Sequence, residues 1–206
     1  MKQIIWSCKD YDIISADSDC LYDMVTFVVN ENYSHHSSVG MPSNNKHEIN
    51  DIYQEELAFV SSSRYYIVYD NNKRIVGSIR VFKWDCNKVI PMQVIFNVFP
   101  CEKIESSPSA AFWHIGRFAI DSNFEFSTIT LFKQLMVLAI SPIVSEAGSY
   151  MLAETDSHLL RVMNALGIQT RQLGNPMMYL SSETVPIYSS YEGLIEFYDR
   201  YKRLLA

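Results

Sequence analysis

The 206-residue sequence lacks the features that mark several large classes of protein. It has no excess of basic residues, because 17 Lys and Arg stand against 23 Asp and Glu, and a net charge of −6 argues against nucleic-acid binding. Its longest apolar run, around residues 136–140, falls far short of the roughly 18 residues that a membrane-spanning helix needs. The first residues hold no apolar stretch long enough for a secretory signal, so we expect a cytoplasmic protein without a membrane span.

Cysteine is scarce and is not arranged for metal binding. Cys8, Cys20, Cys86 and Cys101 form no Cys-x-x-Cys pair, and no histidine lies within a few residues of any of them. Zinc sites usually show such short spacings, so we expect no metal site. We interpret the cysteines as buried or half-buried free thiols in a reducing compartment.

What is present is the composition of a globular domain. Apolar residues make up 48% of the chain and charged residues 19%, which permits a sizeable core and excludes global disorder. We expect one domain over residues 1–206. The polar, Ser- and Asn-rich segment 30–50 predicts a long, mobile loop. His35, His36 and His47 fall within it and are interpreted as solvated side chains.

The periodicity of apolar residues predicts helices and strands in alternation. Helices are predicted over 17–29, 128–140, 157–166 and 191–205, and strands over 65–69, 74–82, 92–98, 111–120, 150–153, 168–172 and 177–180. Early strands joined by short turns should pair antiparallel, and later strands joined through helices should pair parallel. The prediction is therefore an α/β (α+β) fold with a mixed central sheet and helices on both faces.

Capping signals set the ends of two predicted helices. Ser127 is placed to cap the helix at 128–140, and Pro142 is expected to end it. Asp156 or Ser157 caps the next helix, and Gly167 stands where a C′ glycine belongs.

Four blocks of sequence resemble one family of enzymes. Residues 113–121 (WHIGRFAID) are similar to the central strand of the acyl-homoserine-lactone synthases, where an acidic residue and two further positions precede Arg-Phe-Ala-Val. Arg80, within 76–81 (VGSIRV), matches that family's valine-glycine-cysteine-x-arginine strand. The segment 98–100 (VFP) and the glycine-proline pattern over 166–178 supply the other two blocks. The resemblance extends to the related N-acyl amino acid synthases within the GNAT superfamily.

This resemblance implies a GNAT-type fold and transfer of an acyl chain from an acyl-carrier protein, or from acyl-coenzyme A, to the amine of a small molecule. It implies no permanently bound cofactor. The chain departs from the family pattern at His114, where the family has an acidic residue. The family's acidic pair before the hairpin also has no clear counterpart, because Asp51, Glu55 and Glu56 lie nearby at a different spacing.

Acyl transfer from a thioester needs a neutral amine, hydrogen-bond donors for the oxyanion, and a strand along which a pantetheine arm can pair. We assign catalytic roles to His114, as a general base, and to Arg117, as an anchor for a carboxylate or an acidic partner. Substrate and acyl binding are assigned to Arg80, Trp113, Gly116, Phe118, Ser127 and Thr128, and carrier-protein docking to Arg161 and Arg171.

Each assignment has a structural alternative. Arg117 and Arg80 can be ion-pair partners that tie the sheet together. His114 can be a histidine bonded to backbone, and Ser127 can be a helix cap alone. In a regular strand His114 and Arg117 face opposite sides, so either a bulge re-aims one of them or they serve different faces. The aromatic side chains Trp113 and Phe118 can be plain core.

Three functions therefore stay open. The first is an N-acyltransferase of the autoinducer-synthase or N-acyl amino acid synthase kind. The second is an acetyl-coenzyme A-dependent N-acetyltransferase, against which the absence of glycine from 122–128 counts, because such enzymes hold the pyrophosphate in a glycine-rich loop. The third is a catalytically silent GNAT-like domain that binds an acyl ligand or a partner protein.

Overall fold

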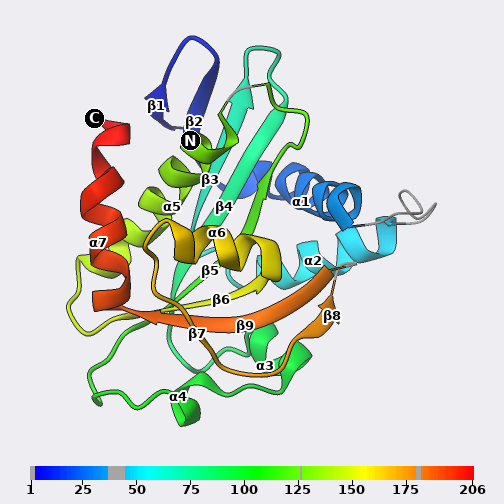
Figure 1. Ribbon diagram of the computed structural model, residues 1–206. Coiled ribbons are helices and arrows are strands. Elements are labelled where there is room, and N and C mark those ends of the chain that lie inside the picture. The colour runs from blue at the N-terminus through cyan, green and yellow to red at the C-terminus, as the bar shows by residue number, and fades with distance from the viewer. Residues whose placement is uncertain (1–2, 37–44, 126, 180–181) are drawn as a thin grey trace. The chain divides into compact units, whose positions relative to one another are not determined.

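A computed structural model describes residues 3–36, 45–125, 127–179 and 182–206 (Figure 1). Its contacts divide the chain into two compact units. The first comprises Met1–Phe82, Arg117–Met136 and Leu205, and the second comprises Lys83–Gly116, Val137–Leu204 and Ala206. That the whole chain folds as one domain stays a prediction.

The first unit is built on antiparallel strands. They are β1 (Gln3–Ser7), β2 (Tyr11–Ala16), β3 (Ser63–Asp70) and most of β4 (Ile75–Trp84), and each pairs with the next. The β3–β4 hairpin is as predicted. Its turn is fixed by the Asp70 carboxylate, which accepts hydrogen bonds from the backbone N–H groups of Asn72 (2.9 Å) and Arg74 (2.8 Å). The two strands β1 and β2 were not predicted.

Two helices occupy much of the segment that the sequence predicted to be a loop. α1 (Leu21–His36) follows a 3-10 turn at Ser18–Cys20, and α2 (Lys46–Leu57) follows it in the chain. The loop predicted over 30–50 is therefore wrong for 30–36 and 46–50, while 37–44 lie outside the described residues. The polar composition reflects the solvent side of two helices that each bury one apolar stripe. The buried apolar side chains are Leu21, Met24, Val25, Val28 and Val29 on α1 and Ile49 and Ile52 on α2.

The second unit holds the mixed part of the sheet. Its strands are the start of β5 (Phe112–Ile120), β6 (Tyr150–Asp156), β7 (Arg171–Gln172), β8 (Met177–Tyr179) and β9 (Ser182–Ser190). β5 pairs parallel with β6, as predicted for strands joined through a helix, and β6 pairs antiparallel with β9. β7 and β8 both pair antiparallel with β9. β5 continues into the first unit from Arg117 onward.

The strand predicted over 92–98 is a helix, α3 (Pro91–Phe96). Pro91 occupies the first helical position, and the Gln93 side chain accepts a hydrogen bond from the Ile90 N–H (3.0 Å). Met92 and Phe96, four residues apart, are buried, whereas Val94 is 73% exposed. That spacing is helical, so burial on one helix face outweighs the β-branched composition. A short helix, α4 (Pro100–Lys103), comes next.

The later helices follow the prediction closely. α5 (Thr128–Val144) starts where expected but continues past Pro142, because the next residue, Ile143, is fully buried and holds the last turn in place. α6 (Ser157–Ala165) is capped by Asp156, and Gly167 adopts the predicted left-handed conformation (φ 98°). α7 (Tyr191–Tyr201) ends in a 3-10 turn at Lys202–Leu205. Within the described residues, no helix combines the length and apolar character needed to cross a membrane.

Candidate active site

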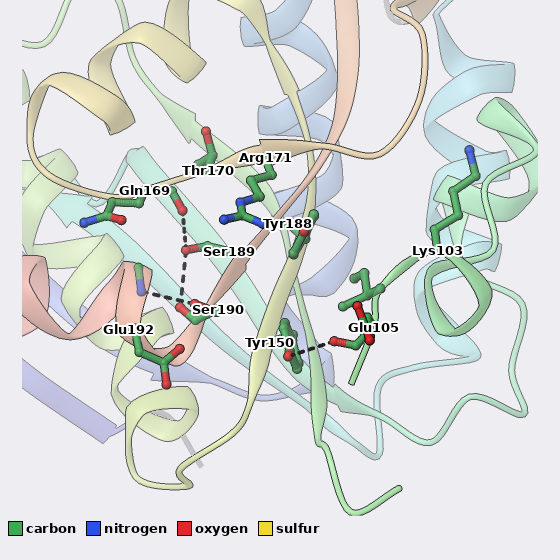
Figure 2. A pocket seen from close by; sticks show the side chains of 12 residues that line it. Lys103, Glu105, Tyr150, Gln169, Thr170, Arg171, Tyr188, Ser189, Ser190 and Glu192 are labelled. Atoms are coloured by element: carbon green, nitrogen blue, oxygen red, sulfur yellow. Dashed lines mark hydrogen bonds between the residues drawn. The ribbon is translucent and has the colours of Figure 1, made fainter. Parts of the chain in front are cut away.

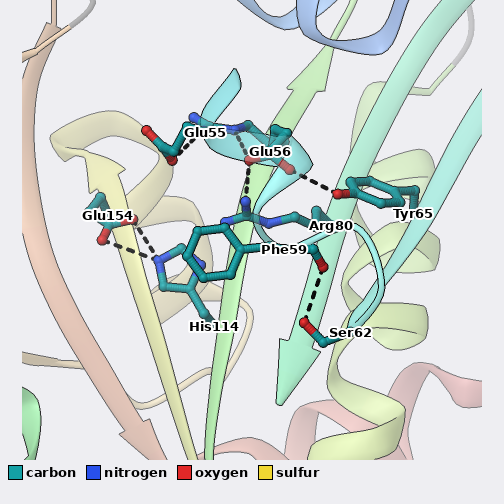
Figure 3. Close-up of polar contacts among 9 residues, drawn as sticks. Glu55, Glu56, Phe59, Ser62, Tyr65, Arg80, His114 and Glu154 are labelled. Carbon is teal, nitrogen blue, oxygen red and sulfur yellow. Dashed lines mark hydrogen bonds and ion pairs between the residues drawn. The ribbon is translucent and has the colours of Figure 1, made fainter. Parts of the chain in front are cut away.

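One fully buried carboxylate joins four elements of the first unit. Glu56, near the end of α2, has no solvent exposure. Its Oε1 accepts hydrogen bonds from the Arg80 guanidinium on β4 and from Arg117 Nε on β5 (2.7 Å). Its Oε2 accepts a hydrogen bond from the Tyr65 hydroxyl on β3 (3.1 Å) (Figure 3). Both oxygens of the carboxylate are therefore engaged, by two cations and one hydroxyl.

Local structure explains how these side chains meet. Ile49, Ile52 and Glu56 recur at helical spacing, so Glu56 lies on the stripe of α2 that is turned to the core. Tyr65 and Arg80 are direct cross-strand partners in the β3–β4 hairpin, so their side chains leave the sheet on the same face.

Arg80 is buried among aromatic rings as well as beside a carboxylate. Its side chain is 1% exposed, and its Cζ lies 4.8 Å from the ring centroid of Phe82 and 5.8 Å from that of Phe59. The two rings stack on each other with centroids 4.7 Å apart. Removing a guanidinium from water is costly, and the Glu56 charge and the ring faces offset that cost.

Charge balance sets the protonation of the cluster. Burial alone raises the pKa of Glu56, but the charges of Arg80 and Arg117, with the hydrogen bonds from Arg117 and Tyr65, hold it below its usual value. Burial and the Glu56 charge raise the pKa of Tyr65, so its hydroxyl remains a donor. Glu55 supplies the second carboxylate, and its Oε1 lies 2.6 Å from Arg117 Nη2. Two arginines thus face two glutamates.

Arg117 has an irregular backbone. Its φ is 53°, in the left-handed region that side-chain-bearing residues rarely occupy, at a cost on the order of 1–3 kcal/mol. Its carbonyl accepts a hydrogen bond from the buried Ser78 hydroxyl on β4 (2.8 Å). The ion pairs to Glu55 and Glu56 hold the side chain, which is 8% exposed. The sequence analysis allowed for a bulge that re-aims His114 or Arg117, and the irregular backbone falls on Arg117.

The second unit holds a histidine–carboxylate pair on neighbouring parallel strands. His114 on β5 is 1% exposed, and its Nε2 lies 3.0 Å and 3.2 Å from the two carboxylate oxygens of Glu154 on β6 (Figure 3). Leu152 is the cross-strand partner of His114, so Glu154 stands two residues further along the same face of β6. In the neutral imidazole Nε2 donates to the carboxylate, which leaves Nδ1 as the acceptor nitrogen.

β5 and β6 pair in parallel within the second unit. Their printed register runs from Phe112↔Tyr150 to Ile115↔Ala153. His114 lies in this paired segment, so the neighbouring strand supplies its carboxylate partner, Glu154.

The remaining residues assigned to substrate binding lie in ordinary structural settings. Trp113 is buried, with Lys83 Nζ 5.9 Å from its ring centroid, and Phe118 packs edge-on against Phe132 at 5.5 Å. Ser127 Oγ accepts hydrogen bonds from the backbone N–H and the hydroxyl of Thr130, so it acts as a helix cap. Gly116 is half-buried and Thr128 is exposed. Their assigned roles stay predictions.

A polar groove of about 640 Å³ lies elsewhere in the second unit (Figure 2). Its walls carry hydroxyl groups and charges of both signs, which do not suit an acyl chain. Arg171 lines it, whereas Arg161 is exposed on α6 and donates from Nε to the Ser157 carbonyl (3.1 Å). The lining residues are Lys103, Ile104, Glu105, Tyr150, Gln169, Thr170, Arg171, Tyr188, Ser189, Ser190, Glu192 and Gly193.

Three carboxylates of the site were missed by the sequence analysis. Glu55 and Glu56 were set aside because their spacing differs from that of the related family, yet they are the partners of Arg117. Glu154 was not considered. For Glu56 a signal existed, since it continues the apolar stripe of Ile49 and Ile52 and so had to be buried with a partner.

Comparison with known proteins gives the fold. No family model and no curated protein matches the sequence. Solved structures do match. FeeM, an N-acyl amino acid synthase from uncultured soil microbes, gives a TM-score of 0.56 at 14% identity, over 92% of this chain and 90% of that one. The AHL synthase LasI gives 0.55 at 14%, over 92% and 94%.

A GNAT-family acetyltransferase from Staphylococcus aureus Mu50 gives a TM-score of 0.54 at 12% identity, over 88% of this chain and 99% of that one. These similarities span nearly the whole of each protein. At sequence identities this low, they show the architecture alone. The chain has the GNAT fold, as its sequence predicted.

Replacing Glu56 by Gln is expected to lower the free energy of unfolding at pH 7 by about 3–5 kcal/mol, because two buried guanidinium groups lose their shared counter-charge. The pKa of Glu56 is depressed in the folded state, so its contribution is present above the unfolded-state pKa of roughly 4.3 and is lost as pH falls through the folded pKa. Denaturant titrations from pH 7 to pH 3 should show a shallower acid loss in Glu56→Gln than in wild type.

Glu55→Gln is the matched control, since Glu55 is one third exposed and contacts only Arg117 among the residues of the cluster. It should destabilise by less than half as much. Equal stability of wild type and Glu56→Gln at pH 7 would contradict the central place given to this carboxylate.

Proposed function

We propose that this protein is an N-acyltransferase that moves an acyl group from a carrier-protein or coenzyme A thioester to the amine of a small molecule. The observation that carries the proposal is the buried His114–Glu154 pair on the neighbouring strands β5 and β6. It is supported by the shared fold of FeeM and LasI, whose names state N-acyl amino acid and AHL synthesis.

His114 would act as the general base. An amine attacks a thioester only when it is neutral, so its proton must be accepted as the new bond forms. Glu154 fixes the orientation of the imidazole and stabilises the imidazolium that results, as a carboxylate does beside a catalytic histidine. The proton then passes to the departing thiolate. Where the related synthases have an acidic residue, this chain has a histidine that is paired with the carboxylate of Glu154.

β5 would hold the thioester. A strand edge can hydrogen-bond the amide groups of a pantetheine arm as an added strand would, so the backbone of β5 around His114 is proposed to bind that arm. The same edge would place backbone N–H groups near the thioester oxygen, where negative charge develops.

Arg117 and Arg80 are proposed as positioning residues. Both guanidinium groups are engaged by the buried Glu56, and Arg117 also by Glu55, so neither is arranged to receive a substrate carboxylate. Their contribution is to hold β5 in its irregular conformation beside His114. This assigns to Arg117 the ion-pair alternative that the sequence left open.

An acetyl-coenzyme A-dependent acetyltransferase is the second candidate, favoured by the fold shared with the Staphylococcus aureus acetyltransferase. The start of α5 speaks against it. Helix α5 begins without a glycine-rich loop, and Ser127 caps it, so fewer backbone N–H groups are open to a pyrophosphate. A carrier-protein donor, which lacks the adenosine diphosphate moiety, is therefore preferred.

The test is mass spectrometry of small-molecule extracts from cells that express the protein. Wild type should yield an acylated amine that is absent from cells with an empty vector, and the product names both the acyl chain and the amine. His114→Gln should reduce the yield by a factor of about 10²–10⁴, since the general base is lost. His158→Gln, which alters an exposed histidine on α6, should leave it unchanged.

If cell extracts contain no product, the purified, folded protein is assayed in vitro with both donor types. A lack of product there as well would favour the silent-domain alternative. A product that persists undiminished in His114→Gln would remove His114 from the mechanism.

Arg161 and Arg171 are proposed to contact the acidic carrier protein, because both are exposed cations of the second unit. Arg161→Glu and Arg171→Glu should each raise KM for the acyl-carrier protein several-fold and leave KM for acyl-coenzyme A unchanged. Arg203→Glu, at an exposed position near the C-terminus, is the charge-matched control. Equal changes with both donors would argue against docking through these arginines.

A further inference from the structure

Two thiols far apart in sequence meet in the second unit. Cys86 lies in the turn after β4 and Cys101 lies on α4, and their sulfur atoms are 3.1 Å apart. The sulfur atoms of a formed disulfide are about 2.05 Å apart, so a shift of roughly 1 Å separates the thiol pair from a bond. Both residues are exposed, which corrects the expectation of buried or half-buried thiols for these two.

The backbone around Cys86 holds its thiol in this place. Cys86 adopts a left-handed conformation (φ 61°). The Asp85 carboxylate accepts hydrogen bonds from the N–H groups of Asn87 (3.0 Å) and Lys88 (3.3 Å), and the Trp84 indole donates to the Lys88 carbonyl (2.6 Å). A turn held by three hydrogen bonds therefore presents a cysteine in a strained conformation.

The backbone at Cys101 is held by contacts of its own short helix. It follows Pro100, the buried first residue of α4, and precedes Ile104, which is also buried. Lys103 donates to the Leu173 carbonyl (3.0 Å), which ties this short helix to a distant segment of the same unit. These contacts hold the backbone at both cysteines, so the folded unit keeps the two thiols within reach of each other.

We propose that Cys86 and Cys101 form a reversible disulfide, and that this pair is a redox modification site of the protein. The oxidant is a low-molecular-weight disulfide of the glutathione class. One cysteine thiolate attacks that disulfide, forming a mixed disulfide and releasing one small thiolate. The second cysteine then attacks the mixed disulfide at the first protein sulfur and releases the other small thiolate. Two protein S–H bonds and one S–S bond are lost, one protein S–S bond and two small thiols are formed, and the small disulfide is reduced.

The chemistry of the pair agrees with a slow, condition-dependent reaction. The pKa of Cys86 is raised to about 12. The larger cause is the partial burial of its sulfur, and the second is its hydrogen bond with Cys101. A thiol that stays protonated reacts slowly, so we expect the disulfide to form slowly. The bond would close the loop that contains α3 and so limit its freedom in the unfolded state.

The test uses the full-length protein equilibrated with defined ratios of reduced and oxidised glutathione, followed by alkylation and trypsin. Cleavage after Lys83, Lys88 and Lys103 places the two cysteines on separate peptides, 84–88 and 89–103. Oxidised wild type should yield these two peptides joined, lighter by two hydrogen atoms than their sum, and reduction should separate them.

Cys8→Ser is the matched control and should give the same joined peptide, whereas Cys86→Ser and Cys101→Ser should give none. Oxidation should raise the unfolding midpoint of wild type by roughly 6–12 °C and leave that of Cys86→Ser unchanged. Separate glutathione adducts on both cysteines without a joined peptide, at every ratio, would overturn the proposal. So would pairing of either cysteine with Cys8 or Cys20.

Discussion

The buried Glu56 carboxylate is the interaction on which the rest of the site depends. It has no access to water, so its charge is tolerable only beside cations, and Arg80 and Arg117 supply them. Each arginine is itself buried and needs an anion in return. Removing Glu56, Arg80 or Arg117 leaves an uncompensated charge inside the first unit. Because the members come from α2, β3, β4 and β5, the cluster fixes a helix and three strands relative to one another.

This cluster also explains why β5 departs from regular geometry at one residue. Arg117 keeps a left-handed backbone because its side chain is held by Glu55 and Glu56 and its carbonyl by Ser78. Strained backbone of this kind persists only where the surroundings over-determine it. The strained residue follows His114 by three positions in the chain. In the proposed enzyme, the histidine–glutamate pair of the second unit performs the proton transfer.

Sequence patterns predicted the elements whose signals are local. The β3–β4 hairpin, the central strand β5 and the helices α5 to α7 follow from periodicity, capping residues and turn chemistry. β9 was missed because it contains Pro186, and proline usually argues against a strand that pairs with another strand on each side. The Pro186 carbonyl accepts a hydrogen bond from the Leu173 N–H, so its missing N–H faces the gap between β7 and β8. α2 was missed because its polar side faces solvent and only a narrow stripe is apolar.

The site itself could be predicted only in part. Arg117 and Arg80 were recognised because a charged residue inside an apolar strand needs a partner, and His114 because it stands where the related family has an acidic residue. Their partners were not, since the contacts join residues 24, 61 and 40 positions apart in the chain. Nothing local in the sequence specifies such a pairing. It arises only when folding brings Glu56 of α2 against Arg80 and Arg117, and β6 beside β5.

The most direct test of the account is a crystal structure of the protein with a non-hydrolysable acyl-pantetheine amide. The account predicts the pantetheine amides hydrogen-bonded to the backbone of β5, with the acyl carbonyl within reach of His114. A ligand bound elsewhere, such as in the polar groove that Arg171 lines, with β5 making no contact to it, would contradict the proposed site.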